Sequence, residues 1–266
     1  MHAQHGHLKI HPKFRSQILK NERDLIVYLP PGYDSSGFRR YPVCYMHDGQ
    51  NLFDPATAFC GNDWRLQTTT DDLINTGQIP PLIIVGVNNT GETRLLEYTH
   101  VAQDSGRGGK APAYGRALVR EVKPLIDQEY RTLTAPECTT LGGSSLGGLV
   151  SAYIGVKHPE VFGNLILMSP SVWWAGRDIL KRIKAARSAP RPRVWLDIGT
   201  QEGSDPDSCV RDVRALRDAF LAKGWQLGRD LMYQEEEGAQ HNERAWAQRM
   251  GPALRFLYST SAKFDS

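Results

Sequence analysis

The stretch Leu141-Gly142-Gly143-Ser144-Ser145-Leu146-Gly147-Gly148 decides the fold. It follows a strand-like run from Glu137 to Leu141, precedes a helix-like run from Leu149 to Lys157, and contains G-x-S-x-G centred on Ser145. In such a strand–turn–helix segment the turn strains the serine backbone, and the flanking glycines keep Cβ atoms away from the neighbouring backbone. We therefore expect the Ser145 hydroxyl at the C-terminal edge of a sheet, beside the free N–H groups that begin a helix.

Other glycine-rich loops fit this stretch less well. A phosphate-binding P-loop requires a lysine before its final Ser or Thr, and no lysine is present. A dinucleotide fingerprint requires glycine at the position of Ser144. The remaining alternative is a glycine-rich turn with incidental serines, so the rest of the sequence has to decide.

Length and composition indicate one soluble globular domain of 266 residues, 40% hydrophobic and 23% charged, with a mean hydropathy of -0.43. No apolar run approaches the ~18 residues that a membrane span needs. The net charge of +3 comes from 32 basic and 29 acidic residues scattered along the chain, which argues against nucleic acid as a partner. Small molecules are the expected partners.

The N-terminal segment 1–20 is interpreted as a polar leader, frayed or contributing an extra strand, ahead of a single domain over 21–266. It lacks the apolar core of a secretory signal, which favours a cytoplasmic location. Its histidines are interpreted as part of this leader and not as a metal site. The four cysteines are far apart and are expected to be free thiols; they are Cys44, Cys60, Cys138 and Cys209.

Strand and helix patterns alternate along the chain. Apolar runs typical of strands covered on both faces occur at Leu25 to Leu29, Val43 to Met46, Leu82 to Val87, Cys138 to Leu141, Leu165 to Met168 and Val194 to Ile198. Helical periodicity occurs at Trp64 to Ile74, Tyr114 to Ile126, Val210 to Leu221 and Trp246 to Leu257. The alternation predicts the α/β-hydrolase fold, a three-layer α/β/α sandwich around a mostly parallel sheet. The stretch between Leu167 and Val194 is too short for a large cap domain.

A serine nucleophile needs an imidazole base held by a carboxylate, and the α/β-hydrolase order along the chain is Ser, acid, His. Only His158 and His241 follow Ser145. No strand separates His158 from Ser145 to carry the acid, so His158 is interpreted as structural. His241, in a loop after the predicted strand Leu231 to Gln234 and just before the final helix, is the candidate base.

The acid is expected just after the strand Val194 to Ile198. The following turn offers Glu202 first, then Asp205 and Asp207, and Glu202 is the preferred candidate. Asp197 lies inside the strand and is expected to cap or brace a neighbouring loop. For each of these carboxylates the alternative is a solvated loop charge.

An oxyanion hole needs two N–H donors. Leu146 N–H supplies one, and Gln50 N–H, from the loop after the strand Val43 to Met46, is proposed as the other. In the alternative interpretation His47 and Asp48 form a turn cap without chemical function. A metal site formed by His47, Asp48 and Asp54 is disfavoured by its spacing, so no metal is expected.

Together these residues resemble the Putative esterase family of α/β-hydrolases, in particular its enterochelin-esterase-like and esterase D-like branches. The similar stretches are Tyr41-Pro42 through the loop His47 to Asp54, Arg94 with Glu97-Tyr98, Gly142 to Leu149, His158 to Gly163 and Ser169 to Trp174. The resemblance implies a serine esterase with Ser145 as nucleophile, Glu202 as acid, His241 as base, and Gln50 and Leu146 at the oxyanion hole.

Members of this family include feruloyl and acetyl-xylan esterases, S-formylglutathione hydrolases and mycolyl-transferring enzymes, so the resemblance leaves the acyl group open. The siderophore esterases carry an additional N-terminal domain, which argues against enterobactin as the substrate. Trp173 and Trp174 are expected either to line a substrate pocket or to pack in the core. Arg94 and Glu97 are expected to brace a loop as a pair.

The sequence thus predicts a cofactor-free carboxylic ester hydrolase that acts on a small-molecule ester through an acyl-enzyme on Ser145. Acyl transfer to an alcohol by the same residues is one alternative. A non-catalytic α/β-hydrolase scaffold that serves as a binding module is the other. The oligomeric state stays open.

Overall fold

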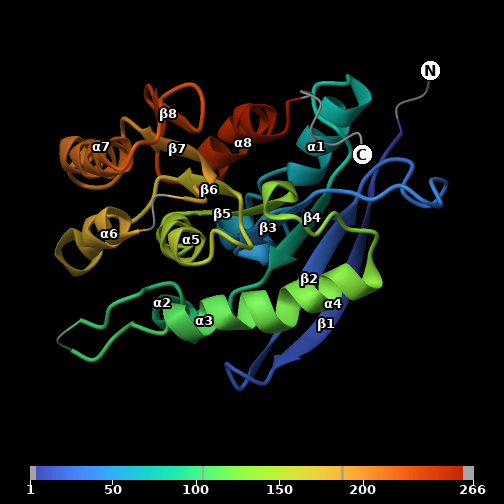
Figure 1. Cartoon of the computed structure of the whole chain (residues 1–266), viewed down its shortest axis with the longest axis horizontal. Coiled ribbons are helices and arrows are strands. Elements are labelled where there is room, and N and C mark those ends of the chain that lie inside the picture. Colours follow the sequence, from blue (N-terminus) through green and yellow to red (C-terminus); the bar gives the residue numbers. More distant parts are fainter. Residues whose placement is uncertain (1–3, 104, 187–188, 260–266) are drawn as a thin grey trace.

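The computed structural model describes residues 4–103, 105–186 and 189–259, and these residues form one eight-stranded sheet in the order β1-β2-β4-β3-β5-β6-β7-β8 (Figure 1). β1 pairs with β2, and β2 with β4, in antiparallel fashion, whereas the other neighbours are parallel. The strands are β1 (His7–Ser16), β2 (Asn21–Leu29), β3 (Val43–His47), β4 (Ile83–Val87), β5 (Thr139–Ser144), β6 (Asn164–Met168), β7 (Arg193–Gly199) and β8 (Leu231–Glu236). The predicted α/β class with a mostly parallel sheet is confirmed.

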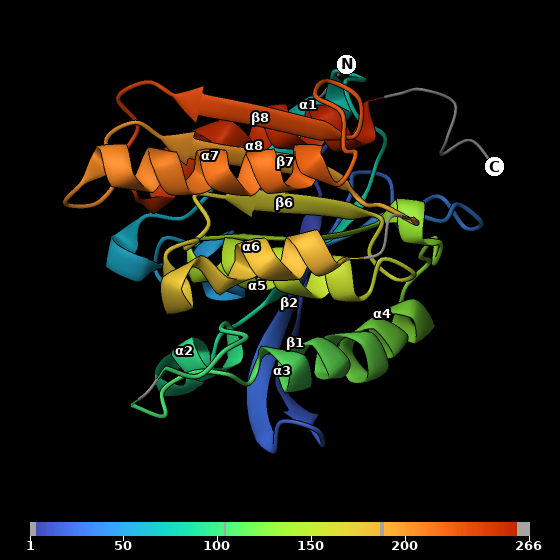
Figure 2. The ribbon, with the colours of Figure 1, turned by 60° about the vertical axis from the view of Figure 1, so that its left-hand side comes forward.

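Helices cover both faces of the sheet (Figure 2). α1 (Leu66–Asn75) and α8 (Glu243–Tyr258) contribute to the hydrophobic cluster on one face. The other face is covered by α3 (Ala111–Ala117), the π-helical segment η4 (Leu118–Val122), α4 (Lys123–Glu129), α5 (Leu146–Lys157), α6 (Trp174–Ala185) and α7 (Pro206–Ala222). Shorter elements lie in the loops: η1 (Gly49–Asn51), η2 (Phe59–Gly61), η3 (Gly91–Thr93), α2 (Arg94–Glu97) and η5 (Pro136–Cys138).

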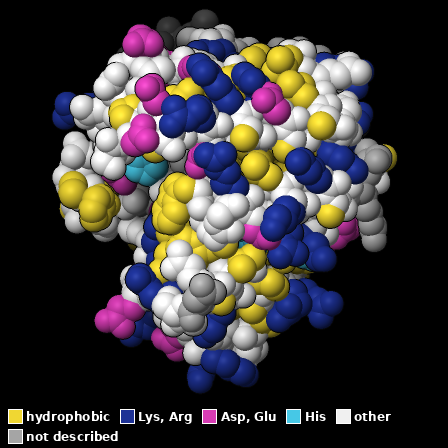
Figure 3. Space-filling model, turned by 90° about the vertical axis from the view of Figure 1, so that its left-hand side faces the viewer, with side chains coloured by type: hydrophobic (Ala, Val, Ile, Leu, Met, Phe, Trp, Pro, Cys, Tyr) yellow, Lys and Arg dark blue, Asp and Glu magenta, His cyan; other side chains and the backbone are white. Residues whose placement is uncertain are grey.

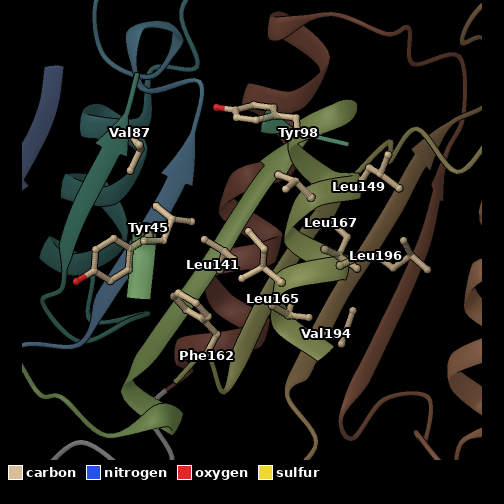
Figure 4. Packing of buried hydrophobic residues seen from close by; sticks show 14 of the residues in the cluster. Tyr45, Val87, Tyr98, Leu141, Leu149, Phe162, Leu165, Leu167, Val194 and Leu196 are labelled. Atoms are coloured by element: carbon tan, nitrogen blue, oxygen red, sulfur yellow. The ribbon is translucent and has the colours of Figure 1, made fainter. Parts of the chain in front are cut away.

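The central strands are buried along their whole length because both of their faces are covered. Figure 4 shows Leu141, Leu165 and Val194, from three neighbouring strands, in the cluster that also contains Leu149 of α5. α5 is apolar nearly all round, and nine of its residues are buried. This helix is therefore fixed by packing against β5 and β6, and it holds the turn that precedes it.

β5 begins and ends later than the sequence predicts. Pro136 opens the short turn η5, and the strand runs from Thr139 through two glycines to Ser144. Glycine weakens a strand by propensity, but a Cβ on Gly142 would lie 2.7 Å from Cβ of Ile166 in β6. Close packing against β6 thus requires glycine here, and the strand extends to the residue before Ser145.

Residues 7–16 of the predicted leader form β1, an edge strand paired with β2. The register shifts between His11 and Phe14, where Lys13 has a positive φ of 52°. The first three residues of the leader, 1–3, and the end of the predicted domain, 260–266, lie outside the described residues.

Between β6 and β7 the chain forms α6, in keeping with the predicted lack of a large cap. Among the described residues no helix is long and apolar enough to cross a bilayer. Lys and Arg side chains are scattered over the face shown in Figure 3, with acidic and hydrophobic side chains between them.

Candidate active site

Ser145 lies in the turn between β5 and α5 with φ 57° and ψ -123°, a strained conformation for a residue that carries a side chain. Its backbone is held on both sides. Ser145 N–H donates to the Met168 carbonyl at 2.9 Å, and its carbonyl accepts from Leu149 N–H and Ser171 N–H, each at 3.0 Å. Its Oγ lies 3.3 Å from Oγ of Ser171. The predicted strained turn is thus present, and the side chain is half-buried.

The glycines of the motif allow this turn to approach β3. A Cβ on Gly143 would lie 3.1 Å from Cβ of His47 and 3.1 Å from the Gly147 backbone, and a Cβ on Gly147 would lie 3.3 Å from Cβ of His47. These spacings are tighter than side chains normally accept. Glycine at both positions therefore permits the Ser145 turn to pack against the end of β3.

Glu202 and His241 are in direct contact. His241 Nδ1 lies 2.7 Å from Glu202 Oε2, and the Glu202 side chain is 1% exposed whereas that of His241 is 37% exposed. The His241 ring also packs edge-on against Trp246, with centroids 4.9 Å apart. A buried carboxylate that accepts from Nδ1 fixes the tautomer with its lone pair on Nε2, which is the state that a general base requires.

The second oxygen of Glu202 is equally well held. Oε1 accepts from the Ser169 hydroxyl at 2.6 Å and from Gly199 N–H at 2.7 Å. Burial alone would raise the pKa of Glu202, but hydrogen bonds from His241, Ser169 and Gly199 N–H outweigh it and lower the pKa below its ordinary value. Glu202 is therefore ionised at neutral pH.

The other carboxylates near this turn do not contact His241. The side chain of exposed Asp205 accepts from Ser208 N–H at 3.1 Å and caps the start of α7. Asp207 is exposed within the first turn of the same helix. Asp197 is fully buried in β7, where it accepts from Trp195 Nε1 at 2.6 Å.

Ser145 and His241 line the same cavity, which has a volume of about 300 Å³. Within the described residues the Ser145 hydroxyl is hydrogen bonded to Ser171 and not to His241, and such contacts are often loose without substrate. Phe59 and Trp246 give the cavity an aromatic component. Its polar lining comprises Asp48, Gln50, Asn51, Asn89, Arg94, Ser144 and Glu243.

The two residues predicted for the oxyanion hole come from different parts of the chain, the start of α5 and the loop after β3. Leu146 is the first residue of α5, where backbone N–H groups have no partner within the helix. Gln50 lies in η1 and lines the cavity, and its side-chain oxygen accepts from Asn89 N–H at 3.2 Å.

The loop that carries Gln50 is fixed by an ion pair. Asp48 has a left-handed backbone, with φ 57°, and its carboxylate accepts from Arg94 Nε at 2.8 Å and Nη2 at 2.7 Å. Asn89 Nδ2 donates to the same carboxylate at 2.7 Å. A bidentate pair of this kind is geometrically specific, so Arg94 fixes the residue two positions before Gln50.

The structure revises the expected pairing of Arg94 with Glu97. Arg94 binds Asp48, whereas buried Glu97 accepts from Arg23 Nη2 at 2.9 Å and from Asn21 Nδ2 at 2.7 Å. The two residues lie on the short helix α2, and their side chains bind different partners. Each stabilises a loop, but they do so separately.

His47 is a core residue. Its ring packs against Tyr98 and Tyr114, and its Nδ1 lies 3.0 Å from the Tyr114 hydroxyl. Burial lowers the pKa of His47 to about 3, with Asp48 opposing this effect, so the imidazole is neutral. Among the described residues, no group of three or more His, Cys, Asp or Glu side chains could hold a metal ion.

Three further sequence candidates are not among the described residues that line the cavity. Trp174 is 2% exposed and donates from Nε1 to the Val101 carbonyl at 2.9 Å, so it packs in the core. Trp173 is 56% exposed, and neither tryptophan is among the described residues that line the cavity. His158 is half-buried at the end of α5, with Nδ1 3.2 Å from Glu160 Oε1.

Two residues that contact Glu202 are not predicted as site residues from the sequence: Ser169 and Arg249. Arg249 is 1% exposed on the buried face of α8. The helical spacing could have indicated the role of Arg249. This residue follows Trp246 by three positions and so lies on the apolar stripe of the helix pattern, where a charged side chain needs a buried partner.

A family described as "Putative esterase" matches residues 16–257 of the chain. The chain belongs to this family. It is an esterase, and the resemblance found in its sequence is confirmed. It is 28% identical over 248 residues to the uncharacterized protein YbbA of Bacillus subtilis (strain 168), a match that covers 89% of this chain and 92% of that protein. It is 35% identical over 196 residues to the iron(III) enterobactin esterase of Escherichia coli (strain K12), covering 71% of this chain and 44% of that enzyme.

The fold is shared with solved structures. The BES protein from Bacillus cereus superimposes with a TM-score of 0.75 and 23% sequence identity, covering 95% of each chain. At this level of identity the likeness concerns the fold, and it agrees with the α/β-hydrolase architecture.

Proposed function

We propose that this esterase is a serine carboxylic ester hydrolase that forms an acyl-enzyme on Ser145, with His241 as general base and Glu202 as the acid of the triad. A single domain carries the reaction, without metal or cofactor. The observation that carries the proposal is the 2.7 Å contact between His241 Nδ1 and Glu202 Oε2 beside a cavity that Ser145 and His241 both line. The strained Ser145 backbone supports it further.

In the proposed reaction, His241 Nε2 takes the proton of the Ser145 hydroxyl as Oγ attacks the ester carbonyl carbon. The resulting imidazolium is stabilised by ionised Glu202. Negative charge on the carbonyl oxygen is stabilised by the N–H groups of Leu146 and Gln50. The tetrahedral intermediate collapses when His241 returns the proton to the departing alcohol, and water releases the acid by the same steps.

The substrate is proposed to be a small-molecule ester. The cavity supports this through its volume of about 300 Å³ and its combination of aromatic and polar walls. Siderophore, feruloyl and acetyl esters form the first panel to assay. The siderophore ester is included because the E. coli relative is an iron(III) enterobactin esterase, and the other two because the family includes feruloyl and acetyl-xylan esterases. A cytoplasmic location stays part of the proposal.

The test compares the two adjacent serines. Ser145→Ala should abolish hydrolysis of p-nitrophenyl acetate and labelling by a fluorophosphonate, whereas Ser144→Ala retains Ser145 and should still be labelled. Circular dichroism would verify that both variants are folded. Undiminished turnover by Ser145→Ala would refute the proposal, as would a wild-type protein that takes up no fluorophosphonate.

A further inference from the structure

Beneath Glu202 lies a buried cluster of charged and polar side chains that the proposed reaction does not use directly. The cluster consists of Ser169 after β6, Asp197 in β7, and Trp246 and Arg249 in α8, all of which are at most 5% exposed. The loop after β6, the strand β7 and the helix α8 therefore contribute to it. Ser169 and Arg249 contact Glu202 Oε1, whereas His241 contacts Oε2 and packs against Trp246.

The Ser169 hydroxyl has one possible orientation. It receives hydrogen bonds from Trp246 Nε1 at 3.0 Å and from Arg249 Nη2 at 3.1 Å. Indole and guanidinium N–H groups donate only, so the Ser169 proton has to point to its third neighbour, Glu202 Oε1, at 2.6 Å. Ser169 has a positive φ of 43°, which costs free energy in a residue with a Cβ. The structure thus tolerates a strained residue where it donates to Glu202.

Arg249 lies between two carboxylates. Its Nη1 is 3.0 Å from Asp197 Oδ1, and its Nη2 is 3.4 Å from Glu202 Oε1. All three side chains are at most 2% exposed. Two buried carboxylates cannot both stay ionised at low cost without a cation between them. One guanidinium with two carboxylates leaves a net charge of -1, which matches the imidazolium that His241 becomes during the reaction.

We propose that Arg249 is a positioning residue for the proposed esterase reaction: it neutralises Asp197, directs the Ser169 hydroxyl toward Glu202, and so keeps Glu202 ionised and aimed at His241. The inference rests on the proposed function of Ser145, His241 and Glu202. Asp197 is the counter-charge that retains Arg249 in the interior. Arg249 acts through Glu202 and makes no contact with the reacting atoms.

Two further titratable groups interact electrostatically with Glu202 or His241. Cys209 of α7 is affected by the charge of Glu202, and Glu243 at the start of α8 by that of His241. Neither supplies a positive charge. Burial raises the pKa of Asp197 to about 6 although Arg249 opposes this, so removal of Arg249 would leave the pair of carboxylates prone to bind a proton.

The experiment measures how kcat/KM for p-nitrophenyl acetate depends on pH. In Arg249→Met the carboxylates lack their cation. Either both stay charged and hold a proton on His241 to higher pH, or the two carboxylates retain a shared proton, so that Glu202 is ionised and the enzyme active only at higher pH. Both outcomes move the acid limb of the profile upward by about one pH unit, so kcat/KM at pH values below the limb should fall about tenfold.

The double variant D197N/R249M removes one charge of each sign and restores the net charge of -1. Its acid limb should return to within about 0.3 pH unit of the wild type. Arg249→Lys retains the charge but not the fork of donors, so its acid limb should stay in place while kcat falls. Arg255→Met is the matched control, because Arg255 is an exposed arginine of the same helix whose Nη1 donates to Gln78.

An unchanged acid limb in Arg249→Met, or a double variant no closer to the wild type than Arg249→Met, would overturn the inference. Should Arg249→Met fail to fold, the comparison of Arg249→Lys and D197N/R249M with the wild type still decides it. Failure of the proposed function is recognised separately, since Ser145→Ala would then remain active.

Discussion

His241 and Glu202 meet at 2.7 Å across 39 positions of the chain, and the contact uses only one oxygen of the carboxylate. The other oxygen accepts from Gly199 N–H and the Ser169 hydroxyl. A carboxylate held at both oxygens does not need to reorganise when the imidazole gains a proton, which is the condition for electrostatic preorganisation. The chain thus supplies a rigid partner to a histidine that is partly exposed.

Replacing Glu202 by alanine should therefore reduce kcat for ester hydrolysis by on the order of 10³-fold or more, because His241 loses both its orientation and its counter-charge. Asp205→Ala is the matched control. Asp205 caps α7 through Ser208 N–H and does not contact His241, so its loss should cost about 1 kcal/mol of stability and little rate. Steady-state kinetics of the two variants decide the assignment. A larger loss in Asp205→Ala would give the role of acid to Asp205.

The order of elements and the turn at Ser145 could be predicted from local patterns, because buried parallel strands are continuous apolar runs and the serine turn has a glycine signature. α6 was not predicted. Only Trp174, Ile179 and Ile183 of this helix are buried, and its first turn has left-handed φ values at Ala175, Gly176 and Arg177. A sparse apolar stripe and an irregular start give a weak helical signal.

Contacts between residues that lie far apart in the chain could not be predicted from local sequence patterns. The predicted pair of Arg94 and Glu97 was local, whereas the structure pairs these residues with Asp48 and Arg23, both more than 40 positions away. Local spacing cannot decide between partners that only the fold brings together. Local sequence also cannot predict the exposure of Trp173 and Trp174. These two tryptophans are adjacent, yet Trp173 is 56% exposed and Trp174 is 2% exposed.

Gly199 is expected to be irreplaceable. Its N–H donates to Glu202, and a Cβ at this position would lie 2.3 Å from the Ala239 carbonyl oxygen and 2.8 Å from Glu202 Oε1. Gly199→Ala should therefore separate the loop of Glu202 from that of His241, lowering kcat and destabilising the fold by about 1–3 kcal/mol. Gly37→Ala, with nothing within 4 Å of its Cβ, should change the free energy of unfolding by less than about 0.5 kcal/mol. Urea unfolding would measure the free energy of unfolding of both variants, and steady-state kinetics would measure their kcat. Equal values for Gly199→Ala and Gly37→Ala would contradict this reasoning.

Arg94 is expected to act on kcat through the Gln50 loop. Lysine cannot reproduce the bidentate contact with Asp48, so Arg94→Lys should loosen the loop and lower kcat about tenfold if Gln50 N–H stabilises the oxyanion. Arg116→Lys, on the exposed side of α3, serves as the control. Loss confined to KM would mean that Arg94 contacts substrate instead of fixing the loop.

The buried histidine His47 should make the fold sensitive to acid. Its pKa is lowered by burial from 6.5 to about 3. Between these values the unfolded chain binds a proton at His47 and the folded chain does not. The free energy of unfolding is therefore highest, as far as His47 is concerned, above pH 6.5, and it decreases as the pH falls toward about 3. Each pH unit in this window should reduce the free energy of unfolding by about 1.4 kcal/mol on account of His47.

Buried His100, whose pKa is lowered to about 4 by burial, should add a similar slope over most of the same range. Urea unfolding at several pH values between 6.5 and 4.5 would measure the sum for the wild type. In His47→Gln the amide cannot be protonated, so the slope should fall by about 1.4 kcal/mol per pH unit even if the variant is less stable throughout, and the contribution of His100 should remain. An identical slope in wild type and His47→Gln would mean that His47 becomes protonated within the fold, against its buried position between Tyr98 and Tyr114.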